Sequence, residues 1–181
     1  MKTINDAYRI IAEIDALEDI FMRCRSVFPA LDNSLIGKTS FETAPYYKWR
    51  GYNVSVHTGN QITKDFIDRY STIGKWLNEN AIIRLYGIMD YYGFVKNIKD
   101  YHHISGWKEV ELMRRMRNVF TKTILNYRPE DSDNFQLRKE LMDYFKLEEN
   151  QFSGGEIPTP IDKVIRPIFE GCRQYIAGRN T

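Results

Sequence analysis

Residues 110–125, VELMRRMRNVFTKTIL, contain the most informative local pattern in this chain. At 3.6 residues per turn, the apolar side chains of this stretch gather on one half of a helix and most polar ones gather on the other. Arg117 is the exception, because it projects on the apolar side between Val110 and Ile124. A guanidinium keeps its proton at physiological pH, so at such a position it needs a carboxylate, a phosphate or water. The stretch predicts an amphipathic helix with one cation that requires a partner.

Apolar side chains recur at steps of three and four through most of the chain, which is typical of helices. The first predicted helix covers residues 4 to 28 and ends before Pro29. Residues 60 to 91 form either one long helix or two helices joined near 78–80, and a further helix covers about 107 to 126. Two more helices start at Asp131-Ser132-Asp133 and at Thr159-Pro160-Ile161-Asp162. Ser105 is the expected cap of the 107–126 helix. The start of the last helix combines a capping hydroxyl, a proline at the first helical position and an acid in the first turn. The buried face predicted for this last helix is Val164, Ile168, Cys172 and Tyr175.

Residues 30–58 break this periodicity. We expect a long loop there with at most one short helix, and a loop of that length is usually functional or packed on a partner. No segment of the chain alternates convincingly as a strand. The sequence therefore predicts an all-α fold, a bundle of about five helices in a single domain that covers residues 1–181.

The composition excludes several classes of protein. Charged residues make up 28% and hydrophobic residues 43%, as in globular rather than disordered chains. The net charge of +2 is too small to indicate nucleic-acid binding, so only local clustering of charge could do so. We expect no membrane span, because no run reaches about eighteen apolar residues. Cys24 and Cys172 lack metal-ligand spacing, which favours reduced thiols in a cytoplasmic protein.

Residues 117–122, Arg-Asn-Val-Phe-Thr-Lys, resemble the Arg-Asn-x-x-x-His motif of the HEPN superfamily, small helical domains of prokaryotic toxins, defence systems and RNA-processing proteins. The arginine, the asparagine and the aromatic residue fit, but Lys122 stands where the family has histidine. The resemblance implies a homodimer whose motif helices face each other, and metal-independent RNA cleavage in which the histidine transfers a proton. A lysine, with an ordinary pKa near 10.4, is a poor base at neutral pH.

The resemblance therefore predicts an RNA- or nucleotide-binding domain of a defence or toxin–antitoxin system, with weak or lost ribonuclease activity. Arg117, Asn118 and Lys122 are its expected catalytic residues, and an antitoxin-like protein is an expected partner. Arg114 and Arg115 extend the positive charge along the helix and would attract RNA phosphates if a cleft forms over them.

Several alternatives stay open. Arg117 could form a structural ion pair with Asp90 or Glu111, and the other cations could form an ordinary solvated face. The whole chain could be an interaction or scaffold module whose arginines bind acidic groups of a partner protein, or an unrelated helical enzyme.

The three histidines show no metal-ligand spacing, so neither a metal nor another cofactor is expected. His57 lies in the irregular segment. His102 and His103 precede Lys122 by about nineteen residues, roughly 28 Å along a helix. They could therefore supply the missing base only across a dimer.

Overall fold

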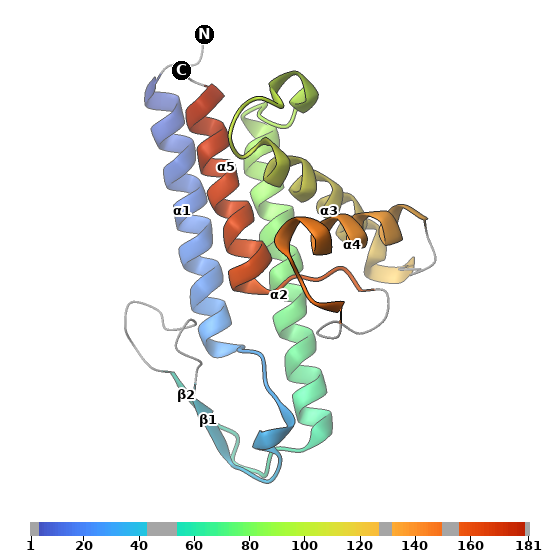
Figure 1. The fold of residues 1–181 in the computed structure, drawn as a ribbon. Coiled ribbons are helices and arrows are strands. Elements are labelled where there is room, and N and C mark those ends of the chain that lie inside the picture. The colour runs from blue at the N-terminus through green and yellow to red at the C-terminus, as the bar shows by residue number, and fades with distance from the viewer. Residues whose placement is uncertain (1–3, 43–53, 127–131, 150–155, 180–181) are drawn as a thin grey trace. The chain divides into compact units, whose positions relative to one another are not determined.

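The computed structural model describes residues 4–42, 54–126, 132–149 and 156–179. Its helices are α1 (Ile4–Val27), α2 (Lys64–Tyr91), α3 (Trp107–Asn126), α4 (Ser132–Phe145) and α5 (Arg166–Arg179) (Figure 1). The predicted all-α bundle of about five helices is confirmed. The apolar repeat between residues 60 and 91 forms one continuous helix, so the second option, two joined helices, is wrong.

The described residues group into two compact units. The first contains the residues up to Asp15 and from Ile82 onward, and the second is Ala16–Ala81. Both α1 and α2 therefore contribute residues to both units. None of the helices in the described part of the chain has an apolar stretch long enough to cross a membrane.

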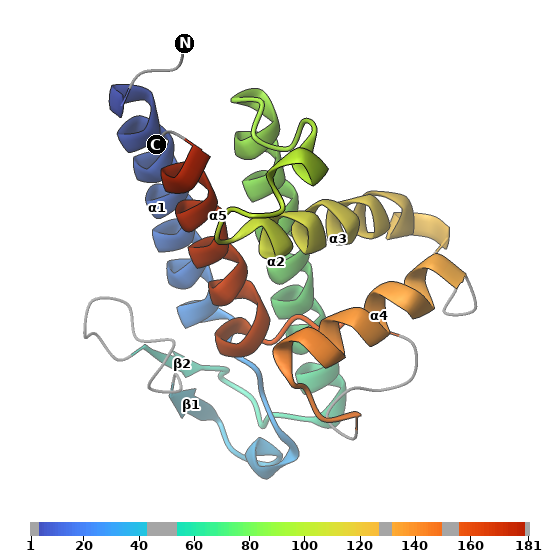
Figure 2. The ribbon, with the colours of Figure 1, turned by 45° about the horizontal axis from the view of Figure 1, so that its top comes forward.

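In the first unit, α3 packs against both α5 and α4, and α3 and α4 lie beside each other (Figure 2). The contact between α3 and α5 is close because it contains glycines. Gly106 precedes α3 with φ +84°, and a Cβ there would lie 1.9 Å from the Gly171 carbonyl oxygen. A Cβ on Gly171 would lie 2.4 Å from Cβ of Glu109. A side chain is thus excluded at both of these positions, where the two helices meet. The hydroxyl of Ser105, the predicted cap, donates to Gln174 Oε1 of α5 at 2.8 Å.

The last helix begins with a π turn (Ile161–Ile165), which leads directly into α5. Pro160 itself occupies the cap position, so the predicted start with a Thr159 cap is wrong by one residue. The backbone N–H of Ile165 donates to the Pro160 oxygen at 3.2 Å, which gives the wider turn. Pro167 lacks an N–H and its ring would crowd the carbonyl four residues earlier, so a widened turn at this point accommodates it. The predicted buried face of this segment is confirmed at Val164, Ile168, Cys172 and Tyr175.

The second unit contains a short 3₁₀ turn (Asn33–Leu35) and two antiparallel strands, β1 (Ser40–Glu42) and β2 (Ser55–His57). Phe41 of β1 stands opposite Val56 of β2. The prediction that no strand forms is wrong, because strands of three residues give too few alternations to be recognised. The strands pack in a small apolar core whose buried members are Phe41, Ile62 and Ile67.

Candidate phosphate-binding site on helix α3

The Arg117 side chain is half-buried and lies over an aromatic ring. Its guanidinium carbon is 4.9 Å from the centre of the Tyr86 ring, which α2 supplies. This distance falls within the range of cation–π contacts. Its Nη1 also donates a hydrogen bond to Asn118 Oδ1 at 3.1 Å. A ring and an amide therefore orient the guanidinium, and neither carries a formal negative charge.

Neither of the two carboxylates predicted as partners of Arg117 pairs with it. Glu111 instead accepts two hydrogen bonds from Arg114, at 2.8 Å and 2.7 Å, and Asp90 is exposed. Within residues 4–42, 54–126, 132–149 and 156–179, Arg117 has no carboxylate at ion-pair distance. Its charge is therefore held in place without being neutralised by these residues.

Asn118 and Lys122 lie four residues apart and thus on one face of α3. The Asn118 oxygen already accepts from Arg117, which leaves the amide NH2 group as a donor for a ligand. Lys122 is exposed. The Thr121 hydroxyl, between them, donates to the Arg117 carbonyl oxygen at 2.9 Å and stays within the helix. The structure thus brings the three predicted site residues onto adjoining faces of one helix.

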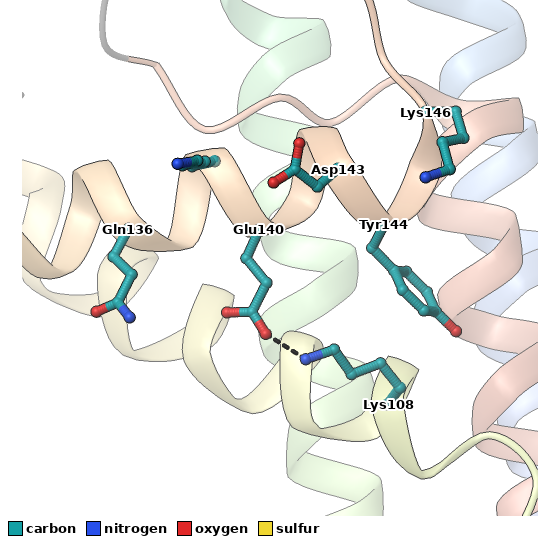
Figure 3. Close-up of a pocket in the computed structure, with 7 residues that line it drawn as sticks. Lys108, Gln136, Glu140, Asp143, Tyr144 and Lys146 are labelled. Carbon is teal, nitrogen blue, oxygen red and sulfur yellow. Dashed lines mark hydrogen bonds and ion pairs between the residues drawn. The ribbon is translucent and has the colours of Figure 1, made fainter.

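Arg115, the other predicted RNA-binding arginine, belongs to an ion cluster. The carboxylate of Glu140 on α4 binds both Arg115 and Lys108 of α3 (Figure 3 shows the Lys108 contact). The side chains of Arg115, Lys108 and Glu140 are 24%, 26% and 27% exposed, so the cluster is largely shielded from water. Partial burial works to raise the pKa of Glu140, but the Lys108 hydrogen bond and the Arg115 charge outweigh it. The pKa therefore lies below its ordinary value of 4.5.

No histidine or cysteine contacts Arg117 in the part of the chain that the structure describes. His102 and His103 are exposed with their ring centres 5.9 Å apart, and His57 is exposed on β2. Both cysteines are free thiols, and burial raises the pKa of Cys172. The described residues contain no group of three histidines, cysteines or acids that could hold a metal ion.

Sequence reasoning missed two residues that define these surroundings. Tyr86 and Glu140 come from other helices, and only the fold brings them to α3. The sequence did indicate that Arg117 requires a partner, but the partners it suggested were a carboxylate, a phosphate or water, and an aromatic ring was not among them.

No protein-family model matches the chain, and neither a curated protein nor a solved structure shows significant similarity to it. The HEPN resemblance thus stays a prediction from Arg117, Asn118 and Phe120. The contacts of Arg117 are the basis for a functional assignment.

Proposed function

We propose that the surface of α3 around Arg117 binds phosphate groups of RNA or of a nucleotide, in a HEPN-like cytoplasmic domain with weak or lost ribonuclease activity. The observation that supports this proposal is the difference in the partners of three arginines on α3. Arg114 and Arg115 are each bound to a carboxylate, whereas Arg117 contacts Tyr86 and Asn118 and no carboxylate among the residues that the structure describes. A guanidinium that is already oriented loses little side-chain freedom when it binds a phosphate.

The neighbouring groups suit the same ligand. The Asn118 amide can donate to a phosphate oxygen or a base edge, and Lys122 adds a second positive charge on the same face. Lys122 is exposed, and an exposed lysine lacks the burial that would help it to act as a base. Binding is therefore proposed as the main activity, and cleavage as a residual one.

A homodimer through α3 is part of this proposal. It would place Arg117, Asn118 and Lys122 of two copies around one composite cleft, where an antitoxin-like protein could also bind. Light scattering on the purified protein should give twice the 21.5 kDa of one chain. A measured mass of one chain at micromolar concentration would contradict the homodimer and the composite cleft.

The second candidate is an interaction module that binds an acidic protein surface. The observation in its favour is that Arg114 and Arg115 are neutralised within the chain, which lowers the charge left for RNA. Exposed aromatic side chains of the first unit, Tyr91 and Phe135, add apolar surface that a protein partner could cover.

The test is equilibrium binding of fluorescent tRNA and single-stranded RNA, without metal, by the wild type, Arg117→Ala and Arg117→Lys. We expect about tenfold weaker binding for Arg117→Ala, corresponding to one lost phosphate contact. Arg117→Lys should fall in between, because lysine keeps the charge without the planar fork. The control is Arg166→Ala, which removes an exposed arginine at the start of α5 that pairs with Asp162 of the π turn, and it should bind as the wild type does. Equal binding by the wild type and Arg117→Ala, or no binding by the wild type, would contradict RNA binding at Arg117 and favour the interaction module.

A further inference from the structure

A shallow depression of about 660 Å³ lies between α3 and α4 (Figure 3), and Arg117 is not among the residues that line it. Its walls are Lys108 of α3 and polar side chains between Gln136 and Lys146, on α4 and just after its end. Gln136, Glu140 and Tyr144 project from α4 toward α3 in this view. A volume of this size is in the range of small-molecule sites.

The charge of this depression is positive. Glu140, on its wall, is already shared by Lys108 and Arg115. Lys139 and Lys146 also line it, and neither has a carboxylate at ion-pair distance among the residues that the structure describes. The lining holds three cations, because Lys108 joins these two lysines, and two carboxylates, because Asp143 joins Glu140, a formal excess of one positive charge. A small anion would be attracted there.

Lys146 is held in a backbone conformation that favours glycine. Its φ is +54°, and it directly follows α4. The next N–H, of Leu147, donates to the Met142 oxygen at 3.0 Å, the hydrogen bond of a Schellman motif. Glycine is usual at this position because it has no Cβ to be strained. A lysine here places an ammonium beside the depression at the expense of backbone strain, and such strain is often found at functional sites.

Tyr144 supplies a flat aromatic wall. It is 40% exposed, and its hydroxyl donates to Glu109 Oε1 of α3 at 2.5 Å, which fixes the ring at one end. Burial, with help from Glu109, raises the pKa of Tyr144, so the hydroxyl stays a neutral donor to that carboxylate. Exposed aromatic faces of this kind stack on nucleobases.

We propose that this depression binds a small phosphate ester that carries a planar ring, of the nucleoside monophosphate class. The phosphate lies on Lys139 of α4 and on Lys146, which directly follows this helix, and the ring stacks on Tyr144. This site is separate from the RNA-binding surface proposed for Arg117, and neither depends on the other.

The test is calorimetric titration of the full chain with AMP, ribose 5-phosphate, adenosine and inorganic phosphate. AMP should bind most tightly, and ribose 5-phosphate and phosphate should bind more weakly but with the same dependence on the two lysines. Lys139→Ala should weaken AMP binding about tenfold. Lys163→Ala removes an exposed lysine of the π turn, outside the depression, and should change nothing.

Lys146→Gly separates a binding role from a structural one. This substitution relieves the positive φ, so the melting temperature should rise while AMP binding weakens about tenfold. The proposal is overturned if AMP does not bind at millimolar concentration, or if the Lys139→Ala, Lys146→Gly double variant binds it as the wild type does. It is also overturned if Arg117→Ala abolishes AMP binding and the double variant does not, since the ligand then belongs to the Arg117 surface.

Discussion

Two regions of helix α3 use the same residue type in opposite ways. Around Arg115, a carboxylate from α4 forms an ion pair with the arginine and links the two helices. Around Arg117, two residues further on, an aromatic ring and an amide hold the arginine, and none of the described carboxylates pairs with it. The partner, and not the arginine, therefore decides whether a cation serves stability or remains available for a ligand.

The two regions should therefore respond differently to substitution. Changes in the Glu140 cluster should alter stability, because they leave half-buried charges without partners. Changes at Arg117 should alter binding with little effect on stability, because this side chain keeps access to water and lacks a described ionic partner. The following variants test this contrast.

The largest effect is expected for Lys122→His, which adds a base to the Arg117 side of the comparison. If this surface is a HEPN-like cleft, the imidazole stands where the motif has histidine, and general acid–base catalysis contributes about a hundredfold to ten-thousandfold. Cleavage of tRNA in EDTA should therefore rise visibly, and Arg117→Ala in the same background should abolish it. A folded, dimeric Lys122→His protein that cleaves no RNA would favour the interaction module. Strong wild-type cleavage that falls on Lys122→His would show that the lysine itself is catalytic.

Gly106→Ala should disturb both regions together, because Gly106 allows α3 to approach α5. The added Cβ meets the Gly171 carbonyl oxygen at 1.9 Å, and φ is +84°. Overpacking and backbone strain together should lower the free energy of unfolding by about 3 kcal/mol, measured by urea denaturation. The matched control is Gly87→Ala in α2, where an added Cβ has nothing within 4 Å. It should stabilise by up to about 1 kcal/mol. Equal stability of the two variants would contradict the close packing.

Glu140→Gln should destabilise the ion-paired region alone, by about 1–3 kcal/mol, because Lys108 and Arg115 lose their shared carboxylate. Since the folded-state pKa of Glu140 is lowered, its contribution is complete above the ordinary pKa of 4.5 and is lost as the pH falls through the folded value. The difference between the wild type and Glu140→Gln should thus be constant near neutrality and shrink below about pH 4.5.

The exposed Asp143, one turn further along α4, provides the control. Asp143→Asn should change the free energy of unfolding by no more than about 0.5 kcal/mol. RNA binding at pH 7 should be nearly the same for both variants and the wild type. A Glu140→Gln protein as stable as the wild type would show that the cluster contributes nothing to stability.

The sequence predicted the helices well because their apolar periodicity is long and regular, as in α1 and α3. It missed the hairpin of β1 and β2, whose strands are too short to show a period. The anomaly at Arg117 was visible in the sequence, since a cation on an apolar face requires a partner. The identity of that partner was not, because Tyr86 lies 31 positions earlier in the chain. Likewise, the sequence could not show that Glu140 binds Arg115, because this ion pair forms only when α4 packs against α3.

Whether Arg117 contacts phosphate is tested most directly by the salt dependence of RNA binding. Arg117→Ala and Arg115→Gln each remove one formal charge from the same helix, so the variants are matched in net charge. Each phosphate contact on a single strand contributes about 0.7 to the slope of log K against log salt concentration. We predict that Arg117→Ala lowers the magnitude of this slope by about 0.7, while Arg115→Gln leaves it unchanged. Equal slopes for the wild type and Arg117→Ala, or a larger loss for Arg115→Gln, would contradict the account.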